Sequence, residues 1–121
     1  MDLLEEYRRA NLFFEAGDPS GAARLLEPIV AVEPDNASVR QLLARAYFQS
    51  AQLGRAEEQL RALVDKDPSD HYAHHVLGRT LERQGRDSEA LTHLRIAAAM
   101  HADHRDYAQA LERVESKVKP R

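Results

Sequence analysis

All six histidines of this 121-residue chain lie between positions 71 and 104. Imidazole and carboxylate groups are ligands that zinc and nickel accept in proteins. An antiparallel helix pair over this stretch would bring His71, His101 and His104 together at one end, so these three are the candidate metal ligands. No tight motif such as H-E-x-x-H supports such a site. Exposed histidines gathered by chance, or a pH-sensitive surface, are the alternatives, and metal binding is a distant third among the functions considered.

Other catalytic chemistry finds little support in the sequence. The chain has no cysteine, which excludes thiol nucleophiles, thiolate metal sites and disulfides. Ser88 and Ser116 have no histidine or acid at a catalytic spacing, and no glycine-rich phosphate loop is present. Paired carboxylates such as Glu57 and Glu58 are typical of solvated helix faces. We therefore expect a protein that is not an enzyme and needs no cofactor.

Composition and charge indicate one small domain over residues 1–121, with 43% apolar and 31% charged residues. No apolar run approaches the roughly 18 residues that span a bilayer. The acidic start lacks the pattern of a signal peptide, so a cytoplasmic location without membrane contact is expected. No basic stripe suggests nucleic acid binding. Residues 1–36 carry eight acids against three bases, and residues 105–121 three acids against five bases. Opposed ends of this kind favour either head-to-tail contact or two differently solvated caps.

The elements that would position any such residues follow from a pattern that recurs every 34 residues. A large apolar residue is followed by alanine, leucine and proline at fixed distances. The three copies are Phe13, Ala22, Leu26 and Pro34; Tyr47, Ala56, Leu60 and Pro68; and Leu81, Ala90 and Leu94, with Ala102 in place of the third proline. A fixed period of this length indicates stacked units that cannot bury their apolar faces alone.

Apolar residues spaced by three and four predict seven helices and no strands. The helices are expected at 3–16, 20–33, 37–50, 54–66, 71–84, 88–101 and 104–118. Gly17 and Gly85 stand where a left-handed residue would close the first helix of a unit. The second unit has Ala51 at that place, so we expect its turn to differ. Asp35 or Asn36, and Ser69 or Asp70, are expected to cap the helices that follow the two prolines.

Within each unit, one stripe of the first helix should pack against the second helix. These inward stripes are Ala10 and Phe13; Leu43, Ala44 and Tyr47; and Leu77, Gly78 and Leu81. The small residue in each stripe would allow the paired helices to approach closely. Pro28 lies inside the second expected helix, where it removes a backbone donor and clashes with the preceding turn. We expect a bend or break near residues 25–28.

These features resemble the tetratricopeptide repeat, a helix–turn–helix of 34 residues with the pattern W-x2-L-G-x2-Y…A-x3-F…P. Leu77-Gly78-x2-Leu81 is similar to the first half, and Ala22-x3-Leu26…Pro34 and Ala56-x3-Leu60…Pro68 to the second. The tryptophan positions hold Glu6, Arg40 and His74. The resemblance implies an all-α, right-handed superhelical solenoid of three repeats at 3–36, 37–70 and 71–104. It also implies a capping helix at 104–118.

In such a fold the first helices of the repeats line a concave groove that holds a partner. A second stripe on each first helix would face this groove, and we call its residues the groove stripe. They are Leu4, Tyr7, Asn11 and Phe14; Ser38, Gln41, Arg45 and Phe48; and Tyr72, His75, Arg79 and Glu82. Asn11, Arg45 and Arg79 are equivalent in register and would form a ladder suited to carboxylates. The aromatic residues would supply contact area, unless they and the arginines are engaged in packing and ion pairs within the protein.

Some members of the family grip the C-terminal tail of a chaperone through basic residues and asparagines on successive first helices. Asn11 matches one of these positions. The others hold Tyr7, Leu42, Tyr72 and Val76, none of which is basic. This departure argues against recognition of the chaperone tail.

The resemblance therefore implies a protein–protein interaction module, an adaptor or scaffold that binds a peptide or partner segment in its groove. The finer expectation is an acidic, carboxylate-bearing segment. The alternative is a structural module that forms homo-oligomers through its acidic start or its exposed helix faces. The expected states are accordingly a monomer or a weak homo-oligomer.

Overall fold

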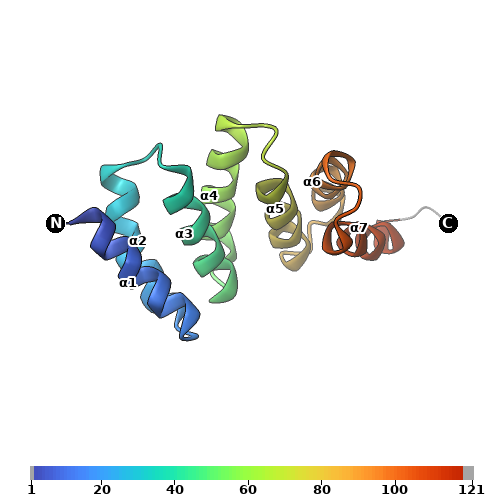
Figure 1. Ribbon diagram of the computed structural model, residues 1–121. Coiled ribbons are helices and arrows are strands. Elements are labelled where there is room, and N and C mark those ends of the chain that lie inside the picture. Colours follow the sequence, from blue (N-terminus) through green and yellow to red (C-terminus); the bar gives the residue numbers. More distant parts are fainter. Residues whose placement is uncertain (1, 119–121) are drawn as a thin grey trace. The chain divides into compact units, whose positions relative to one another are not determined.

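The computed structural model describes residues 2–118, and that part of the chain folds into seven helices without a strand (Figure 1). Their bounds are α1 Leu3–Glu15, α2 Pro19–Val32, α3 Ala37–Gln49, α4 Leu53–Lys66, α5 His71–Arg83, α6 Asp87–Met100 and α7 Arg105–Val118. Every predicted end lies within one residue of the observed one. None of these helices has the length and apolar character needed to cross a membrane.

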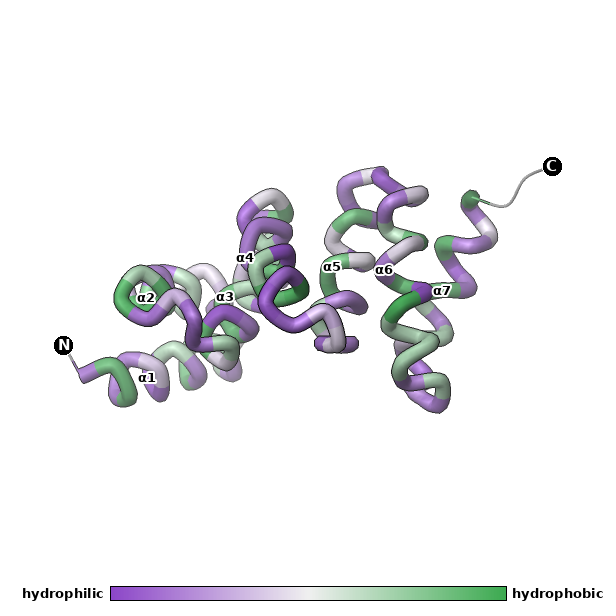
Figure 2. Tube along the Cα trace, turned by 90° about the horizontal axis from the view of Figure 1, so that it is seen from above, coloured by the Kyte–Doolittle hydropathy of each residue, from purple (hydrophilic) through white to green (hydrophobic). Residues whose placement is uncertain are grey.

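The helices gather into two compact units. The first contains α1, α2, α3 and the start of α4 as far as Gln59, and the second runs from Leu60 through α5, α6 and α7. Hydrophobic and hydrophilic residues alternate along each helix in Figure 2, as expected for helices with one packed face. The expectation of a single domain over residues 1–121 stays a prediction.

Four helices begin at side-chain caps that the sequence supplies. Asn36 accepts a hydrogen bond from the backbone N–H of Val39 at 3.2 Å, and Asp70 accepts one from Ala73 at 3.0 Å. Asp2 and Asp18 cap α1 and α2 in the same way. Of the two alternatives at each predicted cap, the residue directly before the helix provides the acceptor, because its side chain reaches the third N–H of the helix.

The turn between paired helices has the same geometry in all three repeats. Gly17, Ala51 and Gly85 have φ values of 85°, 60° and 78°, in the left-handed region. The following N–H donates to the carbonyl five residues earlier in each case, at 2.8–2.9 Å (Asp18 to Phe13, Gln52 to Tyr47, Arg86 to Leu81). The prediction of a different second turn was wrong, because these closing bonds hold Ala51 in a conformation that normally favours glycine.

Small residues set the distance between paired helices. Ala10 and Ala44 have no exposed surface, as the inward stripes predict. A Cβ atom at Gly78 would lie 2.5 Å from Cδ2 of Leu94 and 3.2 Å from the carbonyl oxygen of Ala90, both on α6. Any larger side chain at position 78 would therefore push α5 away from α6.

Two details of the first repeat differ from prediction. Helix α2 runs unbroken through Pro28, so the break that we expected is wrong, and the bend stays a prediction. Pro28 and Arg24 are both exposed, so water can replace the hydrogen bond that the Arg24 carbonyl loses. Phe13 was expected to point inward, but it is 37% exposed, whereas its equivalent Tyr47 is 5% exposed. Tyr47 is also covered by α2, where a hydrogen bond to Glu27 joins burial in raising its pKa to about 12.

The tryptophan positions of the second and third repeats hold polar residues, and each of these residues makes two equivalent polar contacts. Arg40 donates through Nε to the carbonyl of Pro34 at 2.7 Å and through Nη1 to Oε1 of Gln59 at 2.7 Å. His74 contacts the carbonyl of Pro68 through Nε2 at 2.8 Å and Nδ1 of His93 through its own Nδ1 at 3.1 Å. Because a carbonyl only accepts, Nε2 of His74 is the donor in the contact with Pro68. Each pair of contacts links a residue of a first helix to the preceding loop and to the second helix that follows.

Helix α7 packs against the other helices of the second unit through Tyr107, which is almost fully buried. His75 and His104 stack on the Tyr107 ring with centroid distances of 4.5 and 3.8 Å, and His71 bonds its hydroxyl at 2.8 Å. His75 is 6% exposed, and its Nδ1 is buried without a hydrogen-bond partner. Burial, and then the charge of Arg79, lower the pKa of His75 to about 4.

We predict that Ala51→Gly stabilises the protein by about 1 kcal/mol, because glycine adopts a left-handed conformation without the cost that a Cβ atom imposes. Gly17→Ala is the matched control, since its Cβ would meet nothing within 4 Å and would report the backbone cost alone. It should destabilise by a similar amount. Urea unfolding of the two variants measures both effects, and a loss of stability in Ala51→Gly would contradict the assignment.

We predict that acid weakens the fold through His75. Its pKa is about 4 in the folded state against the ordinary 6.5. The contribution of neutral His75 to the free energy of unfolding is therefore fully present above pH 6.5 and falls as the pH drops towards 4. At pH 5 the loss should be about tenfold in the folding equilibrium, or about 1.4 kcal/mol, allowing for solvent screening. His75→Phe keeps a ring against Tyr107 and should reduce the difference between urea unfolding at pH 7.5 and at pH 5. An unchanged difference would place the acid sensitivity elsewhere.

Candidate functional site

In the first unit, the groove stripe forms one face of α1 and α3. The guanidinium of Arg45 lies over the ring of Phe14, 4.8 Å from its centroid. This is a cation–π contact between the two helices. Asn11 donates through Nδ2 to the carbonyl of Tyr7 at 3.1 Å. Tyr7, Asn11, Phe14, Gln41, Arg45 and Phe48 are all half-buried, and Leu4 is exposed. The structure thus brings the stripes of these two helices together.

An open pocket of about 480 Å³ lies at the start of this face. Leu4, Tyr7 and Ser38 of the groove stripe line it, and the buried side chains of Ile29 and Val39 provide apolar surface. Its other lining residues are Leu3, Glu33 and Asn36. Side chains of this kind suit an apolar group, with polar atoms at hand for a backbone.

In the second unit, the groove stripe of α5 meets α7. Tyr72 is half-buried and Arg79 is exposed, but His75 is buried under Tyr107 and does not present the open surface that we expected. Glu82 accepts two hydrogen bonds from Arg113 at 2.7 Å and one from Lys117 at 2.9 Å. These bonds, the Arg113 bond first, lower the pKa of Glu82 to about 2. Glu82 is therefore committed to holding α7.

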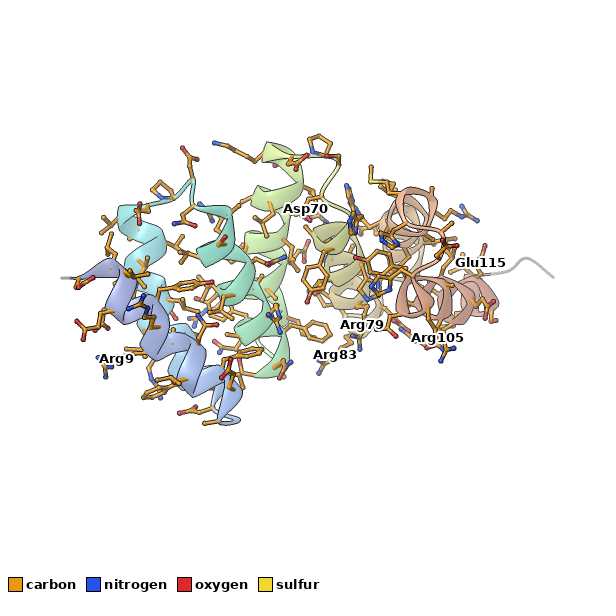
Figure 3. The ribbon with its side chains drawn as sticks, viewed as in Figure 1. Arg9, Asp70, Arg79, Arg83, Arg105 and Glu115 are labelled. Atoms are coloured by element: carbon orange, nitrogen blue, oxygen red, sulfur yellow. The ribbon has the colours of Figure 1, made fainter. Side chains whose placement is uncertain are left out.

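A second pocket, of about 250 Å³, opens between α5 and α7, and we call it the α5–α7 pocket. Its lining residues are His75, Arg79, Asp106, Gln109, Ala110 and Arg113. Figure 3 labels Arg79 and Arg83 on α5 and Arg105 on α7. The polar lining contrasts with the largely apolar pocket of the first unit. Arginines in such a place suit oxyanions.

Sequence reasoning missed the contribution of α7 to this pocket, because it treated α7 only as a solvating cap. Asp106, Gln109 and Arg113 follow one another at spacings of three and four residues, directly beside the core position Tyr107. That spacing places them on one helix face. It was a usable signal for a second polar stripe.

The predicted ladder of Asn11, Arg45 and Arg79 stays a prediction. Its first two members lie in the first unit and the third in the second. Each has a defined local setting: Asn11 bonds the backbone, Arg45 covers Phe14, and Arg79 lines the α5–α7 pocket.

The candidate metal ligands do meet at one end of the third repeat. The ring centroids of His71 and His101 are 5.2 Å apart, and those of His101 and His104 are 5.5 Å apart. The rings pack around Tyr107, however, and His71 uses Nδ1 to bond its hydroxyl. Over residues 2–118, no group of three histidine, aspartate or glutamate side chains has an arrangement that could hold a metal ion.

Comparison with known proteins places this geometry in context. A family model described as "Tetratricopeptide repeat" matches residues 13–79. The BBSome complex member bbs-4 of Caenorhabditis elegans is 30% identical over 84 residues, which cover 69% of this chain but only 18% of that protein. The chain thus spans under a fifth of the length of this relative.

Two solved structures are similar over nearly the whole chain. MamA 41-end from Desulfovibrio magneticus RS-1 has a TM-score of 0.91 at 17% identity, covering 96% of this chain and 66% of that one. The first TPR of Spaghetti (RPAP3), bound to the HSP90 peptide SRMEEVD, has a TM-score of 0.90 at 17% identity, covering 98% and 94%. At these identities the likeness shows the fold alone. With the matching family model and the repeated helix pairs, it establishes that this chain is an all-α member of the tetratricopeptide repeat family.

Proposed function

We propose that this protein binds an extended segment of a partner along the groove stripe of its first helices. The observation that carries the proposal is that groove-stripe residues line a pocket in each unit: Leu4 and Tyr7 in the first, and His75 and Arg79 in the second. The apolar pocket of the first unit suits an apolar side chain, and the cationic pocket of the second unit suits a carboxylate.

The comparisons support this role. Spaghetti (RPAP3) is bound to a peptide in a TPR of the same fold, and bbs-4 is a member of a protein complex. The chaperone tail itself is a poor candidate ligand here. Leu42 and Val76, at two of the positions that would grip it, are buried and apolar. The segment therefore differs in sequence from SRMEEVD, while sharing its acidic character.

A second candidate is self-assembly, which exposed apolar residues on α1 favour. Leu12 is 64% exposed, and Leu4 and Phe13 are also exposed. If the acidic end of one copy meets the basic end of the next, light scattering over a concentration and salt series should show an association that weakens with salt, because the attraction between opposite surface charges is screened. A strict monomer under all conditions would count against assembly and favour the adaptor.

We predict that the double variant Arg45→Glu/Arg79→Glu loses at least about tenfold in affinity for peptides selected from a random library by the native protein, because two attractive charges become repulsive. The matched control is Arg24→Glu/Arg95→Glu, which reverses one exposed arginine in each unit on the second helices α2 and α6. The control should bind normally. Circular dichroism verifies that both variants are folded, and equal binding by the two would refute the role of the groove stripe.

A further inference from the structure

We propose that the α5–α7 pocket is a carboxylate subsite, in which an acidic group of the bound segment sits between Arg79 and Arg113, beside His75 and Gln109. The inference rests on the proposed function, because it names the group that the segment presents to the second unit. A carboxylate offers acceptors only, and arginine and the glutamine amide provide donors that match it.

The charges around the pocket favour an anion. Arg79, Arg113 and Lys117 supply three positive charges, and Glu82 and Asp106 supply two negative ones, which leaves one positive charge in excess. Glu82 is bound by Arg113 and Lys117 at 2.7–2.9 Å. Asp106 is the one acid among the lining residues of the pocket.

Arg113 keeps part of its donor set for a ligand. Its bonds to Glu82 use Nε and Nη2. A guanidinium has five N–H donors, two of which belong to Nη1. Glu82 also fixes the plane of the guanidinium, so less side-chain entropy is lost when a second carboxylate binds.

The charged residues that line the pocket act on the pKa of His75. Burial is the largest cause of its low pKa, and the charges of Arg79, His104 and Arg113 lower the pKa further, against the opposing effect of Asp106. Tyr107 on α7 stacks on the His75 ring, and the rings of His71 on α5 and His101 after α6 contact Tyr107 in turn. Positive charge thus dominates where the ligand would sit.

This arrangement couples ligand binding to a proton. A carboxylate placed beside His75 would offset the arginine charges and favour the imidazolium form, so the pKa of His75 should rise when the pocket is filled. By linkage, the affinity for a carboxylate should increase as the pH falls from the raised pKa of His75 in the complex towards about 4, the pKa of His75 in the free protein. A change in the pKa of His75 would therefore show that a carboxylate occupies the pocket.

Three small probes test the subsite on the full chain. N-acetylglutamine carries only an α-carboxylate, N-acetylglutamic acid α-amide carries only a side-chain carboxylate, and N-acetylglutaminamide carries none. Each is titrated at constant ionic strength while the ring signals of His75 are followed by NMR. We expect saturable shifts and a raised pKa of His75 with at least one acidic probe, and neither with the neutral one. The stronger acidic probe identifies a chain terminus or an acidic side chain as the source.

Variants assign the effect to this pocket. Arg79→Gln and Gln109→Glu should each lower the affinity for the acidic probe at least about tenfold. The first removes the positive charge of a guanidinium, and the second adds a repulsive negative charge. Arg83→Gln is the matched control, since Arg83 lies one turn further along α5 and outside the pocket lining. It should bind as the native protein does. Equal shifts with all three probes, or unchanged binding by Arg79→Gln, would overturn the subsite.

The subsite and the proposed function can fail separately. Binding of library peptides that survives in Arg79→Gln but is lost in Arg45→Glu, with no response of His75 to the acidic probes, would overturn the subsite and leave partner binding in place. An acidic probe that binds at His75 supports the subsite whether or not the library yields a peptide.

Discussion

Close contact between paired helices at small residues is the constraint on which this molecule depends. Helices of 13 or 14 residues are marginal in water by themselves, so their stability comes from packing. At Gly78 the approach leaves no room even for one methyl group, because Leu94 and the backbone of Ala90 occupy that space. Such proximity lets the side chains of each pair interlock, and it orients the groove stripes relative to the packed faces. The placement of every candidate binding residue within a unit follows from it.

Most of the fold was predictable because its signals are local. Aspartate or asparagine begins a helix, a left-handed residue ends it, and the helical period reveals the packed face. The turn at Ala51 was predicted wrongly because residue preference there is overruled by the closing hydrogen bond from Gln52 to Tyr47. The continuity of α2 at Pro28 was missed for a related reason. The cost of a proline depends on whether the carbonyl that it leaves unpaired can reach water, and sequence does not show that directly.

The candidate site was less accessible to prediction because it depends on contacts between elements distant in sequence. The stripe on α5 was predicted from spacing within one helix, whereas the burial of His75 involves Tyr107, more than thirty residues later. Glu82 likewise acquired its role from Arg113 and Lys117. Phe13 shows the converse case, in which a residue that fits the core pattern stays partly exposed.

The side-chain contacts of Arg40 and His74 have a consequence for how the protein responds to acid. Both hold a loop carbonyl and reach the next helix, but Arg40 reaches the amide of Gln59, whereas His74 reaches the imidazole of His93. Burial, and then the charge of His74, lower the pKa of His93, so the folded protein favours its neutral form. A proton bound by His93 would disturb its contact with His74. Acidification should therefore weaken the contacts of His74 while those of Arg40, between a guanidinium and an amide, remain.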